Sequence, residues 1–206
     1  MKYLYFILTI PFFIFAVLFN KFNVGNFQDD LKKCEKDLAN ITDFIDNEIT
    51  NILYIAEDHR YSKHFGIDHY AMLRAIYYTN FKKQFQGGST IAQQYVRVMT
   101  QRYERTWRRK FREQLLAVLI SHQFSLEHIS TAYLKRAFLG SGMNGLNRYL
   151  RWKKITYELS TLEKIEIISR LKYPEPLIPN QEWSSKMKIR VGNISSKLEK
   201  SLPTSL

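Results

Sequence analysis

The sequence contains a single cysteine, Cys34, in 206 residues. A lone thiol cannot form an internal disulfide, so cysteine usage neither requires an oxidising compartment nor excludes one. Acidic residues are also scarce: 19 Asp and Glu stand against 31 Lys and Arg, which leaves a formal net charge of +12. A positive excess of this size indicates an anionic partner, namely nucleic acid, an acidic membrane surface or a phosphorylated substrate.

Alternating strand patterns, internal repeats and low-complexity tracts are likewise absent from the sequence. Apolar residues recur instead at helical spacing, in several segments that follow a capping residue. The apolar content is sufficient for a packed interior, so this pattern predicts an all-α body of several short helices. The length predicts one domain plus an appendage.

The appendage is an uncharged, mostly apolar run at residues 3–19, YLYFILTIPFFIFAVLF. A helix rises about 1.5 Å per residue, so this run approaches the roughly 30 Å of a bilayer's hydrocarbon core. No small-residue cleavage site follows, and we therefore expect an uncleaved transmembrane anchor over residues 1–20. A cleaved signal peptide and an interfacial segment are the alternatives. Residues 21–44 are polar and are expected to form a solvated linker or a short helix before a body over residues 45–206.

Two adjacent carboxylates, Glu57 and Asp58, are expected at the end of a helix that begins near Ile41 and carries Ile49 and Ile52 on its apolar side. A carboxylate at such a position can act as a general base that its neighbour orients. The alternative is a pair of surface acids.

A Gly-Gly-Ser-Thr turn at residues 87–90 precedes an expected helix that carries Gln93 and Gln94. Backbone N–H groups at a helix N-terminus attract an anionic group, although an ordinary cap by Ser89 or Thr90 has the same sequence. No Lys follows at the spacing of a P-loop. The turn is therefore a weak indication of an anion site.

Basic residues are concentrated just beyond this helix, at Arg97, Arg102, Arg105, Arg108, Arg109, Lys110 and Arg112. On a helix expected from about Glu104, the side chains of Arg105, Arg109 and Glu113 share one face. Guanidinium groups beside a carboxylate can hold a diphosphate, with or without a divalent cation on Glu113. The alternatives are a solvated basic face and nucleic-acid binding. Binding of nucleic acid is disfavoured because Trp107 and Phe111 fit a buried stripe better than a base-stacking platform.

In their order along the chain, these segments resemble the signatures of the peptidoglycan glycosyltransferases, glycosyltransferase family 51. EDHRYSKHFGID resembles the first signature, GGSTIAQQ the second, RKFRE with the preceding Arg105 the third, and AYLKRAFLGSGMNGL the fourth. The resemblance covers roughly residues 45–179. It implies a lysozyme-like all-α domain of the monofunctional type, anchored by one pass in the cytoplasmic membrane with its catalytic domain on the outer face.

The resemblance also implies an activity, the polymerisation of lipid II into glycan strands with inversion and release of undecaprenyl diphosphate. Glu57 would be the general base for the acceptor 4-hydroxyl, and Glu113 a second catalytic carboxylate that holds Mg²⁺ at the departing diphosphate together with Arg97 and Arg105. The other substrate-binding residues would be Asp58, His64, Gly88, Ser89, Thr90, Gln93, Gln94 and Arg109. Expected partners are lipid II, the growing strand, the membrane and other cell-wall synthesis proteins, and not nucleic acid.

The chain departs from the family pattern at several positions. Arg97 and Val98 stand where the family reads Lys-Asn, Thr131 and Lys135 replace a Glu and an Asn of the fourth signature, and the fifth signature is reduced to IISRLKYPEPLIP. Two alternatives to an active polymerase follow. One is a relative that binds lipid II or a synthesis partner without turnover, and the other is a glycan-cleaving enzyme, which would need a protonated catalytic Glu.

Overall fold

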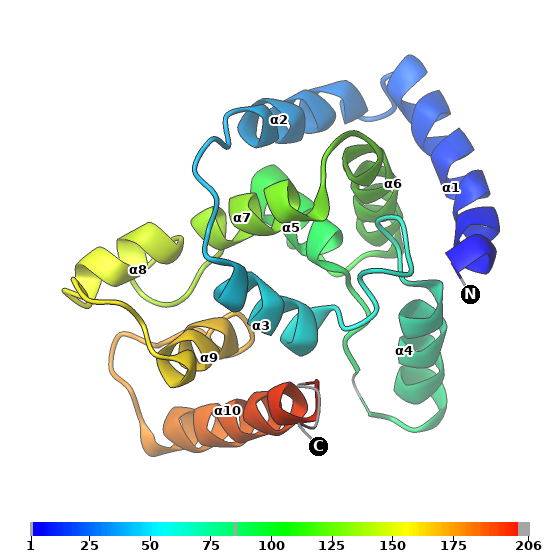
Figure 1. The fold of residues 1–206 in the computed structure, drawn as a ribbon. Coiled ribbons are helices and arrows are strands. Elements are labelled where there is room, and N and C mark those ends of the chain that lie inside the picture. The colour runs from blue at the N-terminus through cyan, green and yellow to red at the C-terminus, as the bar shows by residue number, and fades with distance from the viewer. Residues whose placement is uncertain (1, 85, 202–206) are drawn as a thin grey trace, which may run out of the picture. The chain divides into compact units, whose positions relative to one another are not determined.

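The computed structural model describes residues 2–84 and 86–201. These residues form ten α-helices and no β-strand (Figure 1), and the all-α prediction is confirmed. The chain folds into two compact units. The first contains residues 1–43 and 60–133, and the second contains residues 44–59 and 134–206.

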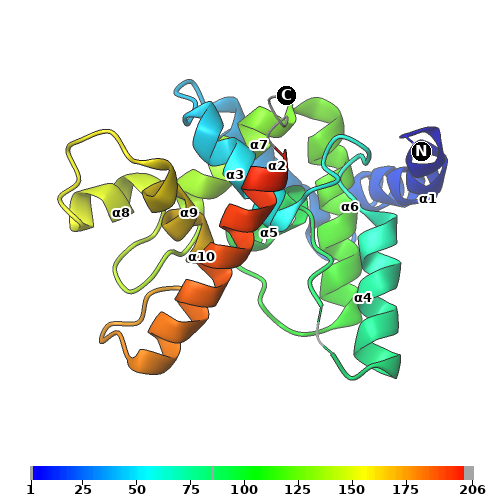
Figure 2. The same cartoon turned by 60° about the horizontal axis from the view of Figure 1, so that its bottom comes forward.

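The first unit is built around α6 (Trp107–Gln123), in which every residue from Glu113 to Ile120 is buried. Helices α5 (Ile91–Thr100) and α1 (Lys2–Lys21) pack against α6. Helix α4 (His69–Phe81) lies beside α6 (Figure 2), where the Gln114 amide donates to Met72 Sδ at 3.1 Å. The greater part of α7 (Leu126–Arg136) completes this unit. Since α6 is covered on so many sides, its buried polar residues are held in fixed positions.

Helix α2 (Phe27–Ala39) occupies the stretch for which a solvated linker was one expectation. Four apolar residues at helical spacing are buried on one face of α2, namely Phe27, Leu31, Cys34 and Leu38. On the polar side, the Asp30 carboxylate accepts from Arg102 Nε at 3.1 Å and from Arg112 Nη2 at 2.7 Å. The stretch is thus a packed helix that supports α5 and α6.

Helix α1 has 20 residues and a mean hydropathy of 2.0, and among the described residues it is the one candidate to cross a membrane. One side of α1 nevertheless makes polar contacts with the first unit. The Tyr5 hydroxyl donates to Asp68 Oδ1 at 2.9 Å, and Thr9 Oγ1 lies 3.0 Å from His69 Nε2. The remaining sides expose large apolar side chains, as a membrane-inserted segment requires.

The second unit contains α3 (Asn47–Glu57), α8 (Leu146–Trp152), α9 (Thr161–Ser169) and α10 (Gln181–Ser201), with α3, α9 and α10 packed against one another. Helix α3 begins later than predicted because the Asp46 side chain caps it by accepting from Glu48 N at 3.1 Å. Lys164 of α9 contacts Asp46 Oδ2 at 2.6 Å and so holds the capping carboxylate in place. The predicted end of α3 at Glu57 is confirmed.

Capping side chains set several of the remaining helix boundaries. Asp68 caps α4, Thr90 caps α5, and Ser160 with Glu163 forms a capping box at α9. The predicted start of α6 near Glu104 is wrong. Thr106 Oγ1 accepts from Arg109 N at 3.2 Å, so the helix begins at Trp107. Trp107 is 74% exposed and does not belong to the apolar stripe.

Gly145 precedes α8 with a φ of +83°, and a Cβ at this position would lie 2.1 Å from the Lys135 carbonyl oxygen. We expect Gly145→Ala to lower the free energy of unfolding by more than about 1 kcal/mol, because it adds both a clash and an unfavourable φ. Gly192 in α10 is the control, since an added Cβ there meets no atom within 4 Å. Gly192→Ala is expected to raise stability by about 0.5–1 kcal/mol. Denaturant unfolding in detergent measures both, and equal stabilities would contradict this interpretation.

Candidate functional site

The Glu113 carboxylate is buried in the first unit, with its side chain 2% exposed. Two cations come from its own helix, at the third and fourth residues of α6. Lys110 Nζ donates to Glu113 Oε1 at 2.8 Å, and Arg109 Nη1 pairs with Oε2. The spacings of three and four residues place all three side chains on one side of α6. The local sequence Arg-Lys-Phe-Arg-Glu therefore builds most of the cluster by itself.

Helix α5 supplies a third cation. Arg97 approaches the same carboxylate as a fork, with Nε 3.1 Å from Oε2 and Nη2 3.0 Å from Oε1. Three cationic side chains thus face one carboxylate, which leaves an excess of two positive charges in the set Arg97, Arg109, Lys110 and Glu113. This set is the Glu113 cluster. It is suited to bind an anion of high charge density.

The Gly-Gly-Ser-Thr turn joins this cluster. Lys110 Nζ donates to Ser89 Oγ at 3.0 Å and to Gln93 Oε1 at 2.6 Å, and Arg97 Nη2 donates to Ser89 Oγ at 3.3 Å. Thr90 Oγ1 donates to the Gly66 carbonyl at 2.7 Å, which ties the turn to the loop before α4. The predicted turn residues and the predicted basic residues therefore form one site within the first unit.

The pKa shifts reflect this excess of positive charge. Burial alone would raise the pKa of the Glu113 carboxyl, but Lys110 and Arg97 outweigh burial and lower it. Burial lowers the pKa of the Lys110 ammonium, Glu113 opposes that shift, and Arg97 and Arg109 add to it. A bound anion would offset the repulsion among the cations, so the cluster gains from an anionic ligand.

Gly88 has a steric role in this site. A Cβ on Gly88 would lie 2.8 Å from the Ala71 carbonyl oxygen and 3.1 Å from Ala75 Cβ, because the turn passes close to α4. Gly87, its neighbour, would carry a Cβ with no atom within 4 Å. Gly88, and not Gly87, therefore permits the close approach of the turn to α4 that places Ser89 beside the cluster.

The predicted base belongs to the second unit. Glu57 is the last residue of α3, and its Oε1 accepts from Arg190 Nη2 of α10 at 2.6 Å. Asp58 follows as the C-cap, is 5% exposed, and donates its backbone N–H to the Tyr54 carbonyl at 2.9 Å. The alternative of two surface acids fails for Asp58, because this residue is buried.

Other predicted site residues lie in the first unit. The Gln94 side chain accepts from the Tyr133 hydroxyl at 2.6 Å. The His64 ring lies 6.4 Å from the Tyr5 ring, centroid to centroid. Arg105 is exposed and precedes α6, so the prediction that it shares a helical face with Arg109 and Glu113 is wrong. The Thr106 cap is the physical reason, since the helix begins at Trp107, two residues after Arg105.

Two charged residues at these sites were not among the predicted site residues. Lys110 donates to Glu113, Ser89 and Gln93, and its spacing of three residues from Glu113 was a signal for this contact. Arg190 pairs with Glu57 across 133 residues of sequence, and no local pattern indicates that pair.

The residues of the Glu113 cluster do not fit a resident divalent cation. Mg²⁺ is bound by several oxygen ligands, whereas this donor set is one carboxylate among three cations. Both Glu113 oxygens already accept from these cations, and a metal ion would have to displace them. Binding of Mg²⁺ stays a prediction of the family resemblance, and the cluster itself supplies the positive charge.

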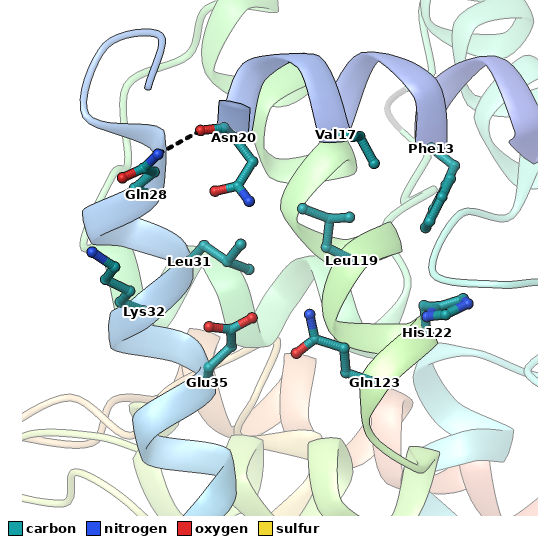
Figure 3. Close-up of a pocket in the computed structure, with 10 residues that line it drawn as sticks. All are labelled: Phe13, Val17, Asn20, Gln28, Leu31, Lys32, Glu35, Leu119, His122 and Gln123. Atoms are coloured by element: carbon teal, nitrogen blue, oxygen red, sulfur yellow. Dashed lines mark hydrogen bonds between the residues drawn. The ribbon is translucent and has the colours of Figure 1, made fainter. Parts of the chain in front are cut away.

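A cavity of about 500 Å³ lies elsewhere in the first unit, among side chains of α1, α2 and α6 (Figure 3). Its polar border includes Gln28, whose amide donates to the Asn20 carbonyl at 2.7 Å. The lining carries one lysine, Lys32, and one glutamate, Glu35, so it has no excess charge that would select an anion. None of the predicted site residues lines this cavity.

Comparisons with known proteins show which family the chain resembles. A family model described as Transglycosylase matches residues 24–198. Penicillin-binding protein 1A of Aquifex aeolicus is 35% identical over 141 residues, which are 66% of this chain and 19% of that protein. The monofunctional glycosyltransferase of Staphylococcus haemolyticus is 33% identical over 114 residues, which are 55% of this chain and 42% of that protein. The chain therefore matches less than half the length of these curated relatives.

Replacing Glu113 by Gln tests the electrostatics of the cluster. The pKa of Glu113 is lowered in the folded state. Its carboxylate therefore stabilises the fold above the unfolded-state value of about 4.3, and this contribution is lost as the pH falls through the folded-state pKa. Glu113→Gln lacks the contribution and leaves three part-buried cations without their counter-ion, at a cost of up to about 3–5 kcal/mol.

The measurement is the free energy of unfolding in detergent from about pH 7 to about pH 3. Wild type should lose stability more steeply on acidification than Glu113→Gln. Glu104→Gln removes an exposed carboxylate next to α6 and should follow wild type. Parallel curves for wild type and Glu113→Gln would contradict the assigned role of the carboxylate.

The two adjacent glycines of the turn offer a matched pair. Gly88→Ala should cost about 1–3 kcal/mol of stability, because the new Cβ overlaps the α4 backbone. Gly87→Ala should stay within about 0.5 kcal/mol of wild type. Thermal unfolding of both variants checks this, and a Gly88→Ala variant as stable as Gly87→Ala would show that the close approach is not required.

Proposed function

The chain belongs to the transglycosylase family, and from this premise we propose that it is a peptidoglycan glycosyltransferase that polymerises lipid II into glycan strands and releases undecaprenyl diphosphate. The observation that carries the proposal is the Glu113 cluster, in which three cations surround one buried carboxylate beside the Gly-Gly-Ser-Thr turn. The first signature, with Glu57 at a helix end, supplies the second chemical group.

The leaving group determines what the cluster must do. A diphosphate departs as an anion and needs no strong acid, but it does need positive charge where its own charge develops. Lys110 and Arg97 meet this need, since both carry donors in a site with a net positive charge. Charge-assisted hydrogen bonds of this kind are about twice as strong as neutral ones. We assign the departing diphosphate to the Glu113 cluster.

Glu57 supplies the complementary chemistry. Its carboxylate removes the proton from the acceptor 4-hydroxyl as that oxygen attacks the anomeric carbon of the donor chain. The bond from this carbon to the diphosphate oxygen breaks on the opposite side, which inverts the configuration. The ion pair with Arg190 fixes the position of the Glu57 carboxylate at the end of α3.

The departure from the family pattern at Arg97 is compatible with an active enzyme. Arg97 keeps the charge of the usual Lys and adds a two-pronged contact to Glu113.

The alternative of a glycan-cleaving enzyme is disfavoured, because it requires a protonated Glu in an apolar environment and Glu57 is paired with Arg190.

Helix α1 and a family that synthesises cell wall suggest membrane anchoring. We further propose a single pass through the cytoplasmic membrane with the catalytic units on its outer face, where lipid II and the growing strand are the substrates. Other cell-wall synthesis proteins are proposed partners.

The proposal is tested by incubating the detergent-solubilised protein with fluorescently labelled lipid II and resolving the products by gel electrophoresis. Wild type should yield glycan chains, and Glu57→Gln should lose about 10²–10⁴-fold in rate, because it lacks the base. Glu182→Gln removes an exposed glutamate of α10 and should retain full activity. Wild-type rates in Glu57→Gln would exclude Glu57 as the base.

A further inference from the structure

The contact between Glu57 and Arg190 lies wholly within the second unit, where α10 packs against α3 and α9. Arg190 follows the buried Met187 by three residues and precedes the buried Ile194 by four, so all three side chains share the face of α10 that is packed. The guanidinium is therefore held by the apolar contacts on either side of it, and its position does not depend on the Glu57 contact alone.

The geometry links Arg190 to two neighbouring residues at the end of α3. Arg190 Nη2 donates to Glu57 Oε1 at 2.6 Å and to the Ala56 carbonyl at 3.1 Å. The Arg190 and Glu57 side chains are 13% and 17% exposed. An ion pair with so little exposure is screened less by solvent than a surface pair and fixes its partners more firmly.

If Arg190 had a purely structural role, it would act as a cation at the C-terminus of α3 and stabilise the last carbonyl groups of that helix. That role explains the contact with Ala56 but not the contact with the Glu57 carboxylate. Arg190 Nε, moreover, is buried and has no hydrogen-bond partner among the described residues. A buried N–H without a partner costs stability, which is typical of a side chain whose position serves function.

We propose that Arg190 is the positioning residue of the general base, and that its guanidinium holds the Glu57 carboxylate by Oε1 in the orientation needed for proton transfer from the acceptor hydroxyl. This inference rests on the proposed glycosyltransferase function. Arg190 acts through Glu57 and is assigned no contact with the substrate. A base must be placed within about 0.5 Å of its productive position, and a carboxylate on a two-carbon stem at a helix end needs a fixed partner to satisfy that condition.

The test is steady-state polymerisation of lipid II by Arg190→Ala, Arg190→Lys and the control Lys188→Ala. Lys188 is an exposed cation two residues away on the same helix. Arg190→Ala should lower kcat by about 10–100-fold with KM nearly unchanged, because geometry at the reacting atoms is lost and substrate binding is not. Arg190→Lys should recover part of kcat, since it retains a cation with donors. Lys188→Ala should behave as wild type.

Chemical rescue separates positioning from folding. Guanidinium ion added to Arg190→Ala at low, non-denaturing concentration should restore part of kcat, while the thermal unfolding temperature stays that of the variant. A loss of kcat that neither Lys nor guanidinium recovers, together with a lower unfolding temperature, would overturn the proposal in favour of a helix-capping role. Faster turnover in Arg190→Ala would overturn it in favour of a contact that restrains the base.

Failure of the proposed function would look different. An inert wild type, or an active Glu57→Gln variant, would reject the assignment of activity or base before Arg190 is considered. With an active wild type and an inactive Glu57→Gln variant, unchanged kcat in Arg190→Ala would reject the positioning role alone.

Discussion

The buried carboxylate of Glu113 is the constraint on which the first unit depends. A carboxylate that is 2% exposed persists in its charged form only if cations compensate the loss of water, and three of them do so from α5 and α6. One negative charge gathers three positive charges in a small volume. The cations remain close together in a protein that already has an excess of them. The cluster therefore explains both how the two helices are joined and why the site suits a diphosphate.

Glu57 has the opposite environment. The Arg190 guanidinium contacts its carboxylate, and the Glu57 side chain is more exposed than that of Glu113. Three cations hold both oxygens of Glu113 and lower the pKa of its carboxyl, which makes it a poor proton acceptor. The different surroundings of the two acids therefore support different roles, the base for Glu57 and the counter-ion of a diphosphate site for Glu113.

Local interactions make several helix ends and part of the Glu113 cluster predictable from the sequence. Thr90 and Asp68 cap their helices through bonds that span three residues, and Lys110 lies three residues from Glu113, so short-range spacing determines these contacts. Short-range spacing misleads where a competing local interaction intervenes. Thr106 caps α6 and thereby leaves Arg105 outside the helix.

Contacts between distant segments were beyond prediction. Arg190 reaches Glu57 across 133 residues, and only the packing of α10 on α3 brings them together. Helix α2 was ambiguous because its apolar residues are diluted by a highly charged face, and their burial depends on α5 and α6 being present.

The separation of roles between Glu57 and the Glu113 cluster is tested most directly by the affinity of the detergent-solubilised protein for undecaprenyl diphosphate. Glu57→Gln should bind it with the Kd of wild type. Lys110→Gln should bind it at least about tenfold more weakly, since a charge-assisted hydrogen bond contributes about 1.5–3 kcal/mol. Equal affinity of Lys110→Gln and wild type would contradict the assignment of the leaving diphosphate to the cluster.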